Sequence, residues 1–173
     1  MSLHSRTWSG SVIGLLLVVL LATLGSFGTA EASDLPRWRW PLLGTRAVVE
    51  PFRAPAHEYG AGHRGVDLVS SVGAIAVAPA DGVIAFRGTV VDRPLLTITH
   101  ADGLVTTFEP LRSTLDPGDA VSAGQEIGTV DVGGHTPAGA LHIGVRRDGA
   151  YINPLLLFGD IPRSILLPCC APL

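Results

Sequence analysis

Short apolar runs, separated by turn residues, fill the chain from Gly62 onward. Val, Ile, Leu and Thr dominate the runs IAVAPA, GVIAFRGTV, LLTITH, LVTTFEPL, EIGTV and ALHIGVRR. Turn residues such as Asp81-Gly82, Asp92-Arg93-Pro94 and Asp148-Gly149 divide them. This spacing predicts short strands in an antiparallel β-sheet sandwich, without a long helix. Alternation at 45–49 predicts a first strand, and YINPLLLF at 151–158 predicts a closing turn packed on the core.

The longest apolar run, VIGLLLVVLLATLG, lies near the N-terminus after one early cation, Arg6. Ala30-Glu31-Ala32 follows it and has the small-x-small form of a signal peptidase site. We interpret residues 1–32 as a Sec-type signal peptide. The mature protein would then be secreted or associated with the cell envelope, without stable membrane insertion. The alternative is a retained anchor, because tolerating Gly and Ser extends the run toward the roughly 20 residues of a spanning helix.

The remaining chain divides into three parts. Residues 33–45 form a mature N-terminal arm in which Trp38 and Trp40 are expected to pack across a sheet. Residues 46–158 form the domain, and the Pro-rich apolar residues 159–173 are expected to form a disordered tail. The two cysteines, Cys169 and Cys170, are adjacent in that tail and cannot cross-link the core.

Composition narrows the class of partner. The 173 residues, 47% of them apolar, are enough for one domain with a hydrophobic core. The formal charge of -3 provides no basic surface, so nucleic acid is excluded as an expected partner. The 21 glycines, 13 prolines and low charged content of 16% favour strands joined by turns.

Three residues have the chemistry and spacing of a zinc site. His63 and Asp67 lie four residues apart with Gly65 between them, where a glycine would let the backbone turn so that both side chains converge. His142 lies on a late strand, and alternation sends it to the face opposite Leu141 and Ile143. A catalytic zinc ion needs three protein ligands and one position for water.

These motifs, in their order, resemble a known family. The matching segments are GHRGVD, VAPADGVIAFRG, TITHADG, TTFEPL, GDAVSAGQEIGTV, ALHIGVRRDG and INPLLL. From about residue 46 to 158 the chain resembles the lysostaphin and LytM type of zinc peptidase, which cuts the peptide cross-links of bacterial cell walls. The resemblance implies a β-sheet sandwich with the metal in a groove on one sheet. It also implies that His63, Asp67 and His142 bind Zn²⁺.

Two further histidines of the family, which act on the water or the oxyanion, do not carry over. Pro110 and Ala140 stand at their positions. Glu109, directly before Pro110, and His135, in the loop GGHTPAG, are candidate catalytic replacements. The variant forms also resemble a branch of the family found in exported actinobacterial proteins.

Three functions are compatible with this pattern. The first is a zinc metalloendopeptidase that acts on peptidoglycan cross-link peptides. The second is an inactive LytM-like module that binds the cell wall or regulates another wall hydrolase. The third is a structural zinc domain with His135 as a fourth ligand. Among the other polar residues, His100 is expected to bond within a turn and His57 to be solvated, while Arg64, Arg146 and Arg147 are expected to be groove-edge or surface cations.

Overall fold

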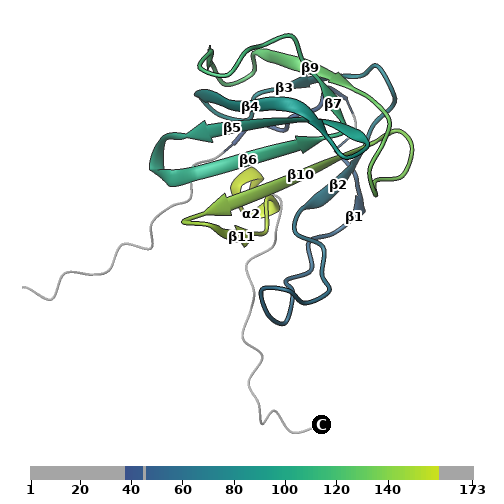
Figure 1. The fold of residues 1–173 in the computed structure, drawn as a ribbon. Coiled ribbons are helices and arrows are strands. Elements are labelled where there is room, and N and C mark those ends of the chain that lie inside the picture. The colour runs from purple at the N-terminus through teal and green to yellow at the C-terminus, as the bar shows by residue number, and fades with distance from the viewer. Residues whose placement is uncertain (1–37, 45, 160–173) are drawn as a thin grey trace, which may run out of the picture. The chain divides into compact units, whose positions relative to one another are not determined.

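A computed structural model describes residues 38–44 and 46–159 of the chain (Figure 1). The predicted signal peptide, the first part of the predicted arm and the tail from residue 160 lie outside the described residues. Cys169 and Cys170 lie outside them too. Within the described residues, strands occupy most of the chain and helices are limited to single turns.

A large antiparallel sheet carries most of the fold. Its strands in spatial order are β1 (Val48–Glu50), β2 (Val66–Val69), β10 (Ala140–Arg147), β6 (Leu104–Glu109), β5 (Arg93–His100), β4 (Gly82–Val90) and β8 (Ala120–Val121), with β11 (Ala150–Ile152) also paired to β10. This order puts the late strand β10 between β2 and β6. Segments that are far apart in the sequence therefore lie side by side at the centre of the sheet (Figure 1).

A second, three-stranded sheet packs against the first. It consists of β3 (Ile75–Val77), β9 (Glu126–Val130) and β7 (Leu111–Arg112). Ala76, Leu111 and Ile127 from this sheet share one hydrophobic cluster with Phe108 and Leu96 of the large sheet. The predicted antiparallel β-sandwich is confirmed.

Alternation along the central strands separates a core face from a polar face. On β10, Leu141, Ile143 and Val145 are fully buried in the core. The intervening His142 and Gly144 lie on the other face, because successive side chains of a strand point to opposite sides. The large sheet therefore buries one face in the sandwich and presents the other as the floor of a groove.

The tryptophans before residue 46 belong to this core. Trp38 and Trp40 are buried, and the Trp40 ring lies 5.3 Å from that of Phe158. The backbone N–H of Trp38 donates to the carbonyl of Leu157 at 2.8 Å. The expected packing of the two tryptophans is confirmed, and it extends the packed part of the chain N-terminal to Arg46.

The turns that join the strands lie at or within a few residues of the positions predicted from the sequence. The Asp148-Gly149 turn between β10 and β11 has φ of 50° and 83°, the left-handed pair of a type I′ hairpin. The turn expected at Asp92-Arg93-Pro94 lies earlier, with Val91 at φ 59°, and Arg93 already begins β5. Pro94 is tolerated there because β6 pairs with β5 only from Leu96 onward, so no ladder bond is lost.

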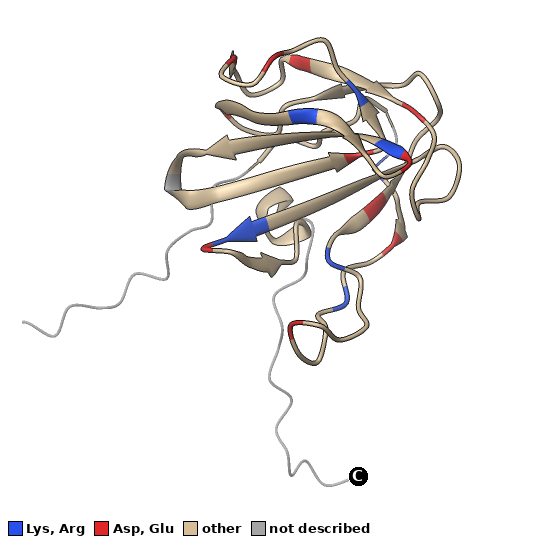
Figure 2. Cartoon of the chain, viewed as in Figure 1, with Lys and Arg blue, Asp and Glu red and all other residues tan. Residues whose placement is uncertain are grey.

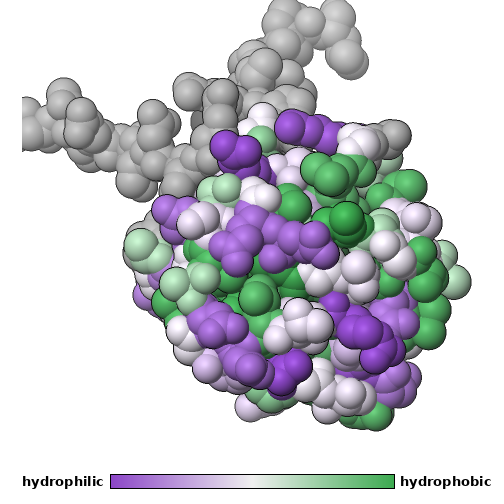
Figure 3. Space-filling model, turned by 90° about the horizontal axis from the view of Figure 1, so that it is seen from above, coloured by the Kyte–Doolittle hydropathy of each residue, from purple (hydrophilic) through white to green (hydrophobic). Residues whose placement is uncertain are grey.

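Two single turns of helix complete the described elements. A 3₁₀ turn (Ala101–Gly103) joins β5 to β6, and α2 (Leu155–Phe158) forms the closing turn, with Leu157 and Phe158 buried. No helix of residues 38–44 and 46–159 is long and apolar enough to span a membrane. On the face seen in Figure 3, hydrophilic and hydrophobic residues are intermixed, so that face has no single continuous apolar surface.

Candidate metal and catalytic site

Three polar side chains form a row across the central strands. In the sheet register His142 of β10 pairs with Asp67 of β2 on one side and with Glu109 of β6 on the other. Cross-strand partners share a face of the sheet, so the three side chains stand together on the groove side. All three are at most 7% exposed.

His63 joins the row from the loop before β2. Its backbone pairs with Arg53 through reciprocal hydrogen bonds of 2.9 and 3.0 Å. Its ring Nδ1 lies 2.9 Å from the carbonyl oxygen of Pro51, which accepts a hydrogen bond from it. Because Nδ1 carries the proton in that bond, Nε2 presents a lone pair to the neighbouring side chains.

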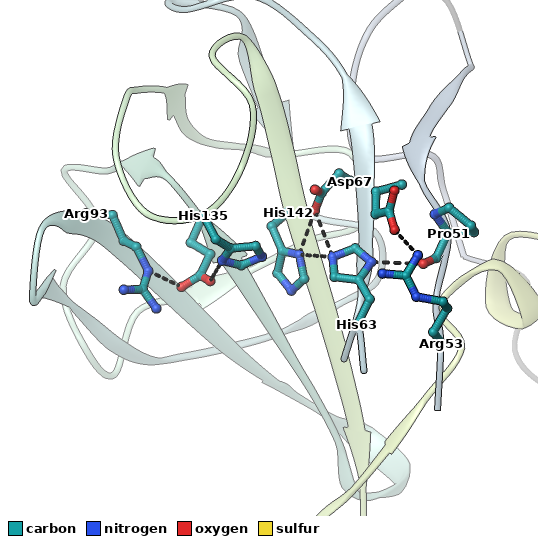
Figure 4. Close-up of polar contacts among 9 residues, drawn as sticks. Pro51, Arg53, His63, Asp67, Arg93, His135 and His142 are labelled. Carbon is teal, nitrogen blue, oxygen red and sulfur yellow. Dashed lines mark hydrogen bonds and ion pairs between the residues drawn. The ribbon is translucent and has the colours of Figure 1, made fainter. Parts of the chain in front are cut away.

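The ligand atoms of His63, Asp67 and His142 converge (Figure 4). Asp67 Oδ1 lies 2.7 Å from His142 Nδ1 and 3.1 Å from His63 Nε2, and the two ring nitrogens are 3.1 Å apart. When His63 is neutral, as a metal ligand must be, only His142 Nδ1 can carry a hydrogen into this triangle, so protons cannot satisfy all three contacts. A cation can, since ligands at about 2.0–2.1 Å from a tetrahedral zinc ion lie roughly 3.3 Å apart. The three residues therefore fit a metal ion.

Gly65 has no side chain, which leaves room for β10 and the His142 ring to approach His63 and Asp67. A Cβ at Gly65 would overlap the carbonyl oxygen of Ile143 and lie 2.6 Å from Cε1 and Nε2 of His142. The backbone of Gly65 does not adopt a positive φ. The chain bends at Arg64 and Gly65 as expected, but without a positive φ, so the close approach of β10 is what requires a glycine here.

The charges of the site act on Asp67. Burial by itself raises the pKa of the Asp67 carboxyl, but the hydrogen bond with His142 and the charges of His142, His63 and His135 outweigh it. The pKa of Asp67 therefore lies below its usual value. A carboxylate that stays ionised is the form that binds a cation.

The loop between β9 and β10 places His135 beside the three residues. Its ring centroid lies 4.9 Å from that of His142 and 5.9 Å from that of His63. One ligand atom from each of His63, Asp67, His142 and His135 can be chosen so that all four atoms lie within 4.8 Å of one another. Without His135, the three remaining ligand atoms lie within 3.1 Å of one another. His135 is thus adjacent to the triangle, and its side chain is 52% exposed on the solvent side.

Glu109 lies behind His135 and is held by an arginine. Glu109 Oε1 is 3.8 Å from His135 Nδ1, and Arg93 Nε donates to Glu109 Oε2 at 2.9 Å. The hydrogen bond to Glu109 raises the pKa of Arg93 above its usual value. Arg93, His135, His142 and His63 follow one another along the groove in Figure 4.

Arg93 was not predicted from the sequence. It lies in no motif, and the sequence places it in a turn next to a proline. Its role depends on the hairpin of β4 and β5, which brings it beside the end of β6. A buried carboxylate such as Glu109 suggests an arginine partner, but the sequence contains several arginines and does not indicate which of them forms the ion pair.

The two altered family positions lie in the same region. Ala140 is two residues before His142 on β10, and Pro110 directly follows Glu109; both are buried. Neither side chain can transfer a proton. Elsewhere, His57 is exposed, and His100 is buried in bonds with the Asp81 carbonyl and Thr106 at 2.8 and 2.9 Å, consistent with the non-metal roles expected of both.

A cavity of about 530 Å³ opens over this row of side chains. It is lined by Gly62, His63, Arg64, Arg93, Leu95, Thr97, Thr107, Glu109, His135, His142, Gly144, Arg146 and Tyr151. The site thus lies in a groove with room for part of a ligand on either side of His142.

The sequence model of peptidase family M23 matches residues 61–154, which include every residue of this site. The chain belongs to peptidase family M23. The predicted resemblance to the lysostaphin and LytM type of peptidase is confirmed.

Two relatives match most of this chain but only part of their own length. The chain is 35% identical over 151 residues to the uncharacterized protein Rv2891 of Mycobacterium tuberculosis, covering 83% of this chain and 61% of that protein. It is 32% identical over 130 residues to the murein hydrolase activator NlpD of Salmonella dublin, covering 73% of this chain and 33% of that protein. The chain thus spans about three-fifths of the first relative and one-third of the second.

A solved M23 structure supports the fold. The catalytic domain of the antimicrobial peptidase lysostaphin from Staphylococcus simulans superposes with a TM-score of 0.57 at 20% identity. The superposition covers 66% of this chain and 93% of that domain. At this identity, the likeness concerns the sandwich and not its activity.

Proposed function

We propose that this protein is an exported zinc peptidase that hydrolyses cross-link peptides of peptidoglycan. The convergence of His63 Nε2, Asp67 Oδ1 and His142 Nδ1 within 3.1 Å carries the proposal. Two imidazoles and one carboxylate form a donor set suited to zinc, and three protein ligands leave a coordination position open. The family resemblance favours zinc over other ions.

Bound zinc would polarise a peptide carbonyl and lower the pKa of a water molecule to about 7. The chain must then move a proton and hold the substrate. His135 is placed for the proton, because its ring borders the ligand triangle and is open to solvent. Glu109 faces the Nδ1 side of that ring, so it would orient the imidazole and balance its charge after protonation.

The pairing of Glu109 with Arg93 favours this division of roles. Glu109 Oε2 already accepts a 2.9 Å hydrogen bond from Arg93 Nε, so this carboxylate oxygen is engaged with the guanidinium. His135 has no such partner among the described residues beyond the Glu109 carboxylate at 3.8 Å. His135 would therefore replace the proton-transfer histidine absent at Pro110 and Ala140, with Glu109 as its positioning residue.

His135 is less suited to be a fourth ligand. The three ligand atoms lie within 3.1 Å of one another, but including His135 widens the group to as much as 4.8 Å. A closed tetrahedral site would need all four at nearly equal separations. This difference supports an open site over a structural zinc domain.

A second function draws support from the relative NlpD, a murein hydrolase activator, and from the two replaced histidines. In that case the domain would bind the cell wall or another wall hydrolase without cutting peptide. The groove would then serve recognition, with the metal as a structural support. Either function would require the mature protein at the cell envelope, which is also where the predicted signal peptide would direct it.

The deciding experiment combines metal analysis with digestion of purified peptidoglycan by the mature protein. The peptidase proposal expects about one zinc ion per chain and release of soluble peptides that stops in His142→Ala. A zinc-loaded protein that releases nothing, but stimulates a separately added wall hydrolase, would establish the activator function instead. A protein without zinc would contradict both metal-dependent proposals.

A further inference from the structure

Beyond the candidate zinc site, the groove continues along β10. Gly144 and Arg146 follow His142 on the same face, at intervals of two residues. Thr107 of β6 pairs in register with Gly144, and Thr97 of β5 pairs with Thr107, their hydroxyl oxygens 3.5 Å apart. This part of the groove therefore has a low, polar floor that leads from His142 to Arg146.

Gly144 keeps that floor low. An added Cβ would lie 3.3 Å from the carbonyl oxygen of Arg64 and 3.5 Å from Cε1 of Tyr151. Arg64 and Tyr151 therefore close over the strand at this point, and any larger residue would narrow the passage between His142 and Arg146.

Arg146 differs in its partners from Arg64 and Arg93, the other arginines that line the groove, and from several arginines elsewhere on the domain. Arg53, Arg87, Arg93 and Arg112 each form an ion pair with a carboxylate. Arg64 instead donates to the backbone carbonyls of Glu58 and Gly60 at 2.7 and 3.2 Å, which anchors its loop. Arg146 has no ion pair with any carboxylate in the described part of the chain, although it is half-buried at the basic end of β10 (Figure 2).

An aromatic ring holds Arg146 in place. Its guanidinium carbon lies 5.8 Å from the centroid of the Tyr151 ring, in the range of a cation–π contact. Arg146 and Tyr151 are also register partners in β10 and β11. A guanidinium supported on one face by a ring keeps its N–H fork free for a planar, bidentate anion.

We propose that Arg146 binds a free carboxylate of the peptide that occupies the groove. This inference deepens the proposed function, on which it rests for the peptide nature of the ligand. Four residues of strand separate the Cα atoms of His142 and Arg146 by about 13 Å. An extended peptide advances at a similar rate, so the bound carboxylate lies about two to four residues from the bond at the metal.

A carboxylate fits better than a polyanion such as nucleic acid or a teichoic-type phosphate chain. The chain has a net charge of -3, and the groove holds one unpaired guanidinium with two hydroxyls and a glycine floor. A polyanion needs a row of cations, whereas one carboxylate needs one bidentate donor. The carboxylate can belong to the peptide C-terminus or to an acidic side chain.

The test measures binding separately from cleavage. The zinc-loaded mature protein is titrated with three forms of a purified peptidoglycan-derived peptide. The first has all its carboxylates, the second has its C-terminal carboxylate converted to an amide, and the third has its side-chain carboxylates converted to amides. Wild type is compared with Arg146→Ala, Arg146→Lys and the matched control Arg147→Ala, whose side chain lies on the adjacent position of β10 and does not line the groove. Circular dichroism and zinc content of each variant exclude unfolding as the cause of a loss.

Wild type is expected to bind the carboxylate form about ten-fold more tightly than one of the two amides, and which amide loses affinity identifies the carboxylate. Arg146→Ala should abolish that difference, Arg146→Lys should retain part of it, and Arg147→Ala should leave it unchanged. An equal preference in Arg146→Ala and wild type would overturn the inference, as would an equal loss in Arg147→Ala. A peptide that binds with this preference but is never cut would reject the peptidase function and leave the subsite standing.

Discussion

His142 Nδ1 lies 2.7 Å from Asp67 Oδ1, although 75 positions of sequence separate the two residues. Antiparallel pairing of β10 with β2 creates this contact, and His63 completes it from a loop that is fixed by backbone bonds to Arg53. The candidate metal site therefore combines a local pair, His63 and Asp67, with a third residue that sheet register brings to it.

Removing either partner of this contact is expected to remove the metal. His142→Ala and Asp67→Asn should lower zinc affinity by well over ten-fold, because two remaining ligands cannot hold the ion. Zinc per chain, measured by mass spectrometry after dialysis, is the readout, and the exposed His57→Ala is the control. Chelation should lower the Tm of wild type and zinc should restore it, since a ligand of the folded state stabilises it. Unchanged zinc content in both variants would refute the site.

Gly65→Ala is expected to disturb the site without altering any ligand. The new Cβ would overlap the carbonyl oxygen of Ile143 and approach the His142 ring to 2.6 Å, so β10 or the ring must shift. We expect zinc affinity to fall about ten-fold or more and stability to drop by about 1–3 kcal/mol. Competition with a fluorescent chelator measures the zinc affinity, and urea unfolding measures the stability.

Gly144→Ala is the matched control for this substitution. It adds the same methyl group on the neighbouring strand β10, where the nearest atom is 3.3 Å away. Its effect on zinc should therefore be much smaller. An equal loss in both variants would mean that a general narrowing of the groove, and not the approach of His142, controls the metal.

If the protein is a peptidase, His135→Ala and Glu109→Gln should reduce turnover of peptidoglycan while zinc content stays unchanged. We expect a loss of about 10²-fold for His135, the usual range for a general base, and a smaller loss for Glu109, which acts through it. Full activity in both variants would show that another group moves the proton.

The tryptophans of the N-terminal segment are expected to support the whole domain. Trp40→Ala should cost about 3–5 kcal/mol, because the indole is 8% exposed and packs on Phe158. The matched aromatic Tyr59, at 88% exposure, should tolerate Ala with a change of about 0.5 kcal/mol or less. Urea unfolding followed by circular dichroism measures both. A chain that begins at Arg46 and unfolds like the intact one would contradict this role.

Local pattern predicted most strands because the chemistry of each lies within a few residues. GVIAFRGTV, EIGTV and ALHIGVRR coincide with β4, β9 and β10, and Asp148-Gly149 forms the hairpin turn that the pair encodes. The first strand begins at Val48, within the stretch where alternation predicted it, and Thr45 lies outside the described residues. Longer motifs in fixed order were enough to identify the family and to place His63, Asp67 and His142 together.

The sequence alone therefore determined the sandwich, the family and the three candidate ligands, because alternation and ordered motifs are properties of neighbouring residues. The sequence also named Glu109 and His135 as candidate replacements for the family histidines, but only the tertiary structure shows where the two side chains lie relative to the triangle. The β9–β10 loop brings His135 to the triangle, and the β4–β5 hairpin brings Arg93 to Glu109. Such contacts depend on how loops and strands from distant parts of the chain pack in space, and spacing along the sequence carries no record of that distance.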